Sequence, residues 1–201
     1  MSRANKNTKK TGFLHELWSI VVTLVMAGII YFVIQTFIGQ SVTVKGQSMY
    51  PTLHEGDHVV LSKISPIDRF DVVIVNEASK GKNEWIIKRV IGLPGDTIEL
   101  RNKQLYINGT LVEEPYTNKD ENEEDRVNIN DFTLATLAST NGVTTVPEGQ
   151  YFVMGDNRAV SLDSRMLGFI DKKDIIGEGV LTYFPFDRFG LPQDYKYLYQ
   201  K

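Results

Sequence analysis

The chain has 201 residues, of which 42% are hydrophobic and 23% are charged, enough apolar sequence for one sizeable folded domain and an appendage. The formal net charge of −3 at pH 7 gives no basic field of the kind that nucleic-acid-binding proteins carry, so nucleic acid is not an expected partner. Cysteine is absent, which excludes disulfides, thiolate metal sites and a cysteine nucleophile.

A long uncharged stretch lies near the amino terminus. No charged side chain occurs between Glu16 and Lys45. The apolar run from Trp18 to Ile38 covers about 21 residues, and as a helix it reaches ~32 Å, which matches the ~30 Å hydrocarbon core of a bilayer. The run is longer than the apolar core of a usual export signal. The sequence therefore predicts one transmembrane helix within residues 16–39, with a buried core helix and a cleaved export signal as alternatives.

Basic residues without acidic partners precede this helix: Arg3, Lys6, Lys9 and Lys10. By the positive-inside rule, such a flank stays in the cytoplasm. We therefore expect residues 1–15 to form a basic cytoplasmic tail and residues 40–201 to form an extracytoplasmic domain, in a protein that crosses the cell membrane once.

The rest of the chain predicts a mainly β fold, with helix mainly in the membrane anchor. Short runs of β-branched and aromatic residues are bounded by the turn signals HEGD, LPGD, NGT and PEG. Asn108-Gly109 has the composition of a two-residue hairpin turn with positive φ at both positions. The predicted strands cover residues 41–44, 57–61, 70–75, 85–91, 96–100, 104–107, 110–114, 150–155 and 178–184.

An acidic segment interrupts this pattern. Between residues 113 and 131, acidic residues outnumber the basic ones, which are Lys119 and Arg126. Such a run is typical of a solvated loop, and it lacks the glycine and ligand spacing of a calcium loop. We therefore expect residues 102–145 to form a hairpin-and-loop insertion that decorates the β-rich domain without binding a metal.

A serine lies just after the predicted anchor, in the stretch KGQSMYPTLHEGD (residues 45–57). Ser48 is followed by Met49-Tyr50-Pro51, in which the proline favours an extended or turn conformation. Serine is itself a common turn residue, so this stretch alone leaves a structural Ser48 as open as a nucleophilic one. A serine nucleophile needs a base to activate it.

Two adjacent cations lie inside the predicted strand WIIKRVI, residues 85–91. Side chains alternate across a strand, so Lys88 shares a face with Ile86 and Val90, and Arg89 lies on the other face. One of the two cations must therefore point among apolar neighbours. An unperturbed lysine has a pKa of about 10.4, and burial lowers it by roughly 3 to 5 units, which brings the neutral amine into working range. Lys88 is therefore a candidate general base.

A polar stretch, GDNRAVSLDSR, occupies residues 155–165. Ser161 offers a hydroxyl that is able to hydrogen-bond a neighbouring amine. A pair of opposite charges is able to fix the geometry of a loop here, either Asp163 with Arg165 or Asp156 with Arg158.

Histidine offers a different base. His54 and His58 follow Ser48 closely, and a Ser-His pair is the commoner hydrolase arrangement. Neither histidine lies in a G-x-S-x-G nucleophile elbow. The third histidine, His15, lies beside the predicted anchor, so the histidines also offer little for a metal site.

Taken together, these stretches resemble the bacterial type I signal peptidases, or leader peptidases, which are serine proteases with a Ser-Lys dyad. The resemblance rests on a membrane span followed by SMYPT, FDVVIV, KRVIGLPGD and GDNRAVSLDSR in the family's order, and it covers Trp18 to about Phe186. The single span and the short insertion are similar to the Gram-positive branch. The resemblance implies a β-rich catalytic domain of the signal peptidase type.

The resemblance also implies a role for each matching residue. The family's nucleophile falls on Ser48 and its general base on Lys88. Ser161 matches the hydroxyl that orients the lysine, and Asp163 and Arg165 match the supporting ion pair. The residues that match the lining of the shallow substrate pockets are Val44, Met49, Leu53 and Ile87.

The chain departs from the family pattern at two positions. Gly46 stands where some members place a serine hydroxyl in the oxyanion hole, so the resemblance implies only the Ser48 main-chain N–H as a donor. Loss of an oxyanion donor typically costs ~10²- to 10³-fold in rate, so this difference matters. Ala159 stands where the family often has a polar residue.

The resemblance implies a peptidase that needs no metal or cofactor and removes signal peptides from exported preproteins, cleaving after small residues in an A-x-A pattern. Its partners are then preprotein substrates and the lipid bilayer. Two alternatives stay open: a membrane-anchored β-domain that binds a partner without catalysis, and a related Ser-Lys autoprotease of the repressor type. Variants of Ser48 and Lys88 test the first alternative, and cleavage of the chain by itself alone favours the second.

Overall fold

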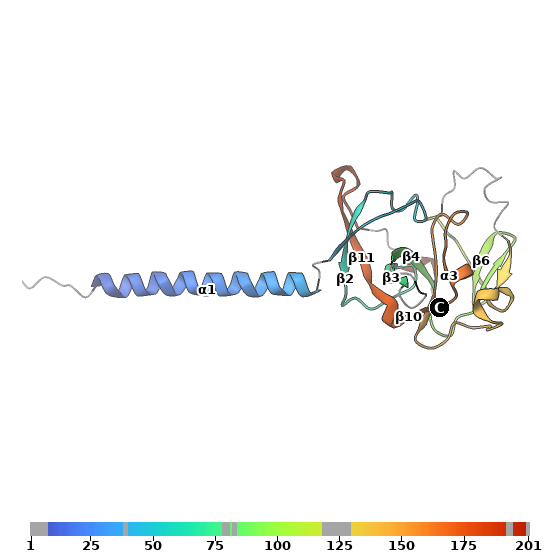
Figure 1. The fold of residues 1–201 in the computed structure, drawn as a ribbon, viewed down its shortest axis with the longest axis horizontal. Helices are drawn as coiled ribbons and strands as arrows, with labels where there is room; N and C mark the ends of the chain where they lie inside the picture. The colour runs from blue at the N-terminus through green and yellow to red at the C-terminus, as the bar shows by residue number, and fades with distance from the viewer. Residues whose placement is uncertain are drawn as a thin grey trace, which may run out of the picture. The chain divides into compact units, whose positions relative to one another are not determined.

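Figure 1 shows a long helix and a β-rich unit. The computed structural model describes residues 8–37, 40–77, 81, 84–117, 130–191 and 195–199. Contacts divide the chain into two units, Met1–Gly39 and Gln40–Lys201. Three segments of interest lie outside the described residues: residues 1–7 of the predicted tail, residues 38–39 of the predicted helix, and residues 118–129 of the predicted acidic insertion.

The first unit is formed by α1 (Thr8–Phe37). Its segment His15–Phe32 has a mean hydropathy of 1.6, and its side chains are exposed. By length and composition this segment is able to cross a membrane, a test that an amino-terminal signal sequence also passes. The predicted amino-terminal apolar helix is therefore confirmed, and it begins at Thr8, within the residues that the sequence assigns to the tail.

The second unit contains two antiparallel sheets (Figure 1). The seven-stranded sheet has the order β1-β2-β11-β3-β4-β9-β10, and the four-stranded sheet has the order β7-β6-β5-β8. The strands of the larger sheet are β1 (Ser41–Thr43), β2 (His58–Ser62), β3 (Val72–Asn76), β4 (Trp85–Gly92), β9 (Gln150–Met154), β10 (Ile170–Asp171) and β11 (Ile175–Phe184). Those of the smaller sheet are β5 (Ile98–Arg101), β6 (Gln104–Ile107), β7 (Thr110–Val112) and β8 (Phe132–Thr133).

Helix is sparse among the described residues of the second unit, where the short α-helix α3 (Ser164–Leu167) follows the polar stretch after β9. Single 3₁₀ turns make up the remaining helical structure that is described here: Leu134–Thr136, Ala138–Thr140, Lys172–Asp174, Phe186–Arg188 and Lys196–Leu198. The predicted mainly β fold is therefore confirmed.

Each predicted strand is present, with ends that differ by a few residues. The hairpin turn between β6 and β7 has φ of 50° at Asn108 and 77° at Gly109, which confirms the predicted pair of positive φ values. The short strands β8 and β10 were not predicted, because two residues are too few to show an alternating pattern.

Strand β4 pairs with β3 over its first part and with β9 over its last part. Its partner β3 runs along it from Val72, opposite Arg89, to Asn76, opposite Trp85. On the opposite side, β9 pairs with β4 only from Arg89 onward. Within the described ranges, the second edge of Trp85–Lys88 therefore carries no neighbouring strand, and its main-chain groups remain available.

Candidate active site

Ser48 and Lys88 meet in the structure. Lys88 Nζ lies 2.8 Å from Ser48 Oγ, although the two residues are 40 positions apart in sequence. Lys88 Nζ also donates to the Ile87 carbonyl oxygen at 3.0 Å. Ser48 lies in the turn that follows β1, whereas Lys88 projects from the half of β4 that β9 leaves unpaired. A hydroxyl and an amine are thus within hydrogen-bond reach, as a nucleophile and its base must be.

The environment of Lys88 favours the neutral amine. The residue is 3% exposed, and its burial lowers the pKa from 10.5 to about 8, because the charged form loses its hydration. The negative charges of Asp163 and Glu77 act in the opposite direction and limit the shift. With a pKa of about 8, roughly a tenth of the molecules carry a neutral lysine at pH 7, which suits a general base.

The backbone around Ser48 is held by the loop after β9. The Asn157 N–H donates to the Ser48 carbonyl oxygen at 3.1 Å. Gly155 packs so closely that a Cβ there would overlap both the Ser161 Oγ and the Ser48 carbonyl oxygen, so glycine is required at this position. Gly46, two residues before Ser48 in the sequence, has a φ of 72°, a left-handed conformation that also favours glycine.

Asp163 and Arg165 form the pair that the sequence predicts. Arg165 Nε donates to Asp163 Oδ1 at 2.8 Å, and a second guanidinium nitrogen donates to Oδ2 at 2.9 Å. Asp163 also accepts hydrogen bonds from the Gly155 N–H at 3.0 Å and from the main-chain N–H of Arg165 at 3.2 Å. Burial opposes its ionisation, but these hydrogen bonds outweigh burial and hold the pKa of Asp163 below its usual value. The pair therefore fixes the loop as a charged unit.

Ser161 is buried, with 2% of its surface exposed, and lies against Gly155 beside the dyad. Among the residues that are described, its Oγ makes no hydrogen bond with Lys88, so the expected contact is not formed. Lys88 instead donates to the Ile87 carbonyl oxygen, in addition to its contact with Ser48. A role for Ser161 in orienting Lys88 stays a prediction.

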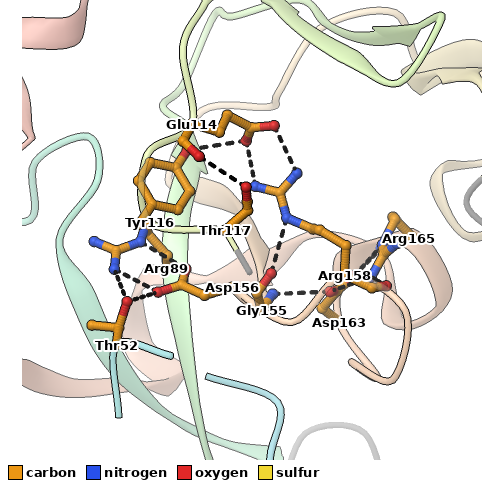
Figure 2. A network of polar contacts seen from close by, with 10 residues as sticks. All are labelled: Thr52, Arg89, Glu114, Tyr116, Thr117, Gly155, Asp156, Arg158, Asp163 and Arg165. Carbon is orange, nitrogen blue, oxygen red and sulfur yellow. Dashed lines mark hydrogen bonds and ion pairs between the residues drawn. The ribbon is translucent and has the colours of Figure 1, made fainter. Parts of the chain in front are cut away.

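The alternative pair Asp156–Arg158 is wrong, because each partner has a different counterion (Figure 2). Asp156 binds Arg89 through two contacts, Nε to Oδ1 at 2.8 Å and a terminal nitrogen to Oδ2 at 2.6 Å. Arg158 binds Glu114. Arg89 is 1% exposed, so both adjacent cations of β4 are buried and each relies on a partner from another segment.

Glu114 departs from the expectation that the acidic run is solvated, and the structure describes only residues 113–117 and 130–131 of that run. The Glu114 side chain is 12% exposed and contacts Arg158 instead of water. The neighbouring Tyr116 is also buried, and its ring lies 4.4 Å from the Arg89 guanidinium carbon. Sequence reasoning missed this role because nothing in the run EEPY distinguishes a glutamate that reaches the core from one that faces solvent.

A cleft of about 720 Å³ opens beside the dyad. Residues 41–45 form one wall and residues 84–88 form the other, with Ser48 and Met49 between them. Of the predicted pocket residues, Val44, Met49 and Ile87 line this cleft. Leu53 does not line it. Leu53 is buried in an apolar cluster together with these three residues, and it borders a second, smaller pocket.

The histidines have other neighbours. The His54 ring packs edge-on against Tyr50, with 5.0 Å between ring centroids. His58 lies against Tyr183 and Phe184. In the described parts of the chain, no group of three or more histidine and acidic side chains is arranged to hold a metal ion.

Comparisons with known proteins agree with this geometry. Residues 17–184 match the family described as signal peptidase, peptidase S26. The chain belongs to this family. Signal peptidase I of Bacillus licheniformis is 39% identical over 184 residues, covering 89% of this chain and 95% of the relative. Signal peptidase I S of Bacillus subtilis strain 168 is 40% identical, with 90% and 94% covered.

Proteins of two further organisms are also similar to this chain. Signal peptidase IB of Staphylococcus aureus strain Mu50 is 36% identical over 180 residues, covering 87% of this chain and 93% of the relative. A crystal structure of a signal peptidase I from Enterococcus faecalis V583 is 42% identical, with a TM-score of 0.49, and covers 57% of this chain and 97% of that chain. Family membership confirms the resemblance seen in the sequence and makes this member of family S26 a peptidase.

Proposed function

We propose that this chain is a membrane-anchored serine endopeptidase that removes signal peptides from preproteins, with Ser48 as nucleophile and Lys88 as general base. The contact of 2.8 Å between Lys88 Nζ and Ser48 Oγ carries the proposal. Family membership adds the substrate class, and it favours neither a non-catalytic binding domain nor an autoprotease. Preprotein processing by the Ser48→Ala variant tests the proposal, and a variant that keeps its turnover contradicts it.

The chemistry follows from the geometry of the dyad. The neutral Lys88 amine takes the Ser48 hydroxyl proton as Oγ bonds to the scissile carbonyl carbon, and the carbonyl oxygen becomes an oxyanion. The Ser48 main-chain N–H is the donor we assign to that oxyanion. Protonated Lys88 then donates its proton to the leaving amine as the peptide bond breaks. A water molecule, deprotonated by Lys88, releases the acyl group and regenerates Ser48.

The cleft suits an extended peptide. Residues 41–45 and residues 84–88 offer unpaired strand edges to a common space, and a peptide strand that enters it gains main-chain hydrogen bonds. Alternate residues of a strand point to the same side. Val44, Met49 and Ile87 supply apolar surface to this cleft, so we expect two small side chains separated by one residue to face it. This arrangement supports cleavage after an A-x-A pattern.

The pH dependence of the rate follows from the pKa of the base. Because burial lowers the pKa of Lys88 to about 8, the neutral form increases as the pH rises through 8 and is complete above it. We expect kcat/KM for a preprotein or signal-peptide substrate to rise about tenfold per pH unit below 8 and to level off above it. A rate profile from pH 5 to 10, with stability checked at each pH, measures this. A flat profile contradicts an amine base.

For the anchor, we propose a single span of the cell membrane, with residues 1–15 in the cytoplasm and residues 40–201 outside. The apolar segment His15–Phe32 supports the span, and the basic flank supports the orientation. A tethered enzyme meets a signal peptide that lies in the same bilayer at a raised effective concentration. Protease added to intact spheroplasts is expected to digest residues 40–201 and to spare an epitope at the amino terminus; the reverse pattern contradicts the orientation.

A further inference from the structure

A largely buried ion pair joins the end of the smaller sheet to the loop that contacts Ser48 (Figure 2). Arg158 donates from both terminal nitrogens to the two carboxylate oxygens of Glu114, and the contact with Oε2 measures 3.1 Å. Glu114 follows the end of β7, and Arg158 follows the end of β9. The side chains are 12% and 5% exposed, respectively. Burying two charges costs desolvation, so such a pair is better explained by positioning than by stability alone.

Arg158 holds the segment that contacts Ser48. Its Nε donates to the Gly155 carbonyl oxygen at 2.9 Å, which closes the loop on itself. Its own carbonyl oxygen accepts a hydrogen bond of 2.8 Å from Arg165. Between these points, the Asn157 N–H donates to the Ser48 carbonyl oxygen at 3.1 Å. A shift of Arg158 therefore moves the donor that fixes the main chain of the nucleophile.

Glu114 is itself held in place. Tyr116 donates its hydroxyl to Glu114 Oε1 at 3.1 Å. Thr117 donates to the Glu114 carbonyl oxygen from its N–H at 3.2 Å and from its hydroxyl at 2.8 Å. The carboxylate thus has donors on both oxygens, and its backbone is part of a turn. A polar network in which every group has a hydrogen-bond partner is rigid, so the position of Glu114 fixes the position of Arg158.

We propose that Glu114 is a positioning residue for catalysis: it holds Arg158, and through Arg158 the loop that places Ser48 beside Lys88. The inference rests on the proposed roles of Ser48 and Lys88. Glu114 does not line the substrate cleft, so its loss should act on the chemical step and not on substrate affinity.

The test compares Glu114→Gln with Glu113→Gln. Both variants lose one negative charge at adjacent positions, but Glu113 is exposed. In the Glu114→Gln variant, an amide NH₂ replaces one of the two carboxylate oxygens that accept from Arg158. The NH₂ group is a donor and cannot accept the hydrogen bond from the guanidinium. Using the full-length protein in detergent and a preprotein substrate, we expect Glu114→Gln to lower kcat about 10- to 100-fold while KM changes less than about twofold. Glu113→Gln should match the unsubstituted chain.

Three outcomes overturn the inference: a kcat within twofold of the unsubstituted chain, a raised KM with unchanged kcat, or a loss of kcat no larger than the loss of folded protein measured by circular dichroism. Glu114→Asp, which keeps the charge, should recover part of kcat, and it carries the test where Glu114→Gln does not fold. Ser48→Ala in the same assay separates the two proposals. An active Ser48→Ala variant refutes the dyad, whereas an inactive one beside a fully active Glu114→Gln refutes only the positioning role.

Discussion

Replacing Ser48 with alanine is expected to lower the rate of preprotein cleavage by roughly 10⁴- to 10⁶-fold, because the attacking oxygen is lost while the fold stays intact. Lys88→Ala should lose a comparable factor, since no other base contacts the Ser48 hydroxyl among the residues described. Lys88→Arg should also be inactive, because a guanidinium stays protonated at every working pH. The measurement is kcat/KM for a preprotein in detergent, with circular dichroism to confirm folding.

The double variant sharpens this experiment. Residues that act as one catalytic unit are not additive, so Ser48→Ala combined with Lys88→Ala should be no slower than either single variant. Ser65→Ala is a suitable control, because Ser65 bonds Ser62 and lies outside the cleft. Near-normal turnover in either the Ser48→Ala or the Lys88→Ala variant contradicts the proposed Ser-Lys mechanism.

The second large effect is expected in stability and not in chemistry. Asp156→Ala leaves the Arg89 guanidinium, which is 1% exposed, without its counterion. Removing one partner of a buried pair typically costs about 3 to 5 kcal/mol, because the remaining charge stays desolvated. Part of the guanidinium's environment survives, since Arg89 also donates to the Phe70 carbonyl oxygen at 2.7 Å and lies against the Tyr116 ring. We therefore expect a loss of about 3 kcal/mol in the free energy of unfolding.

Urea denaturation measures this loss. Asp187→Ala is the matched control, because Asp187 pairs with Arg188 at 3.6 Å and its side chain is 73% exposed. A solvent-exposed pair contributes little, so the control should show no measurable change in midpoint. Equal midpoints for Asp156→Ala and the unsubstituted chain contradict the view that Asp156 neutralises a buried cation.

Much of the β fold could be predicted from the sequence, because the strands consist of β-branched and aromatic runs between clear turn signals. Asn108-Gly109 shows this best, since local chemistry alone fixes its conformation. The burial of Lys88 could be predicted for a related reason, because a cation inside an apolar strand has to lie among apolar neighbours. The pairing of Lys88 with Ser48, in contrast, came from a resemblance and not from spacing.

The supporting network was harder to predict. Asp156 lies two residues from Arg158, and nearness in sequence suggested a pair, but the sheet places Arg89 closer to the carboxylate. Glu114 depends on the same kind of information, because its partner is 44 residues away. Such partners are set by which strands pair within a sheet and by how the two sheets come together, which no short stretch of sequence records. Ser161 shows a further limit, since a matching position does not fix which hydrogen bond a hydroxyl makes.

The edge of β4 that β9 leaves unpaired bears on how freely secreted proteins evolve. A strand edge offers N–H and C=O groups that are alike for every amino acid except proline, so a client recognised there needs little more than an extended backbone and two compact side chains. In this proposed mode of binding, the other side chains of a signal peptide take no part in recognition at the strand edge. One enzyme of this design is able to serve a large and changing set of exported proteins.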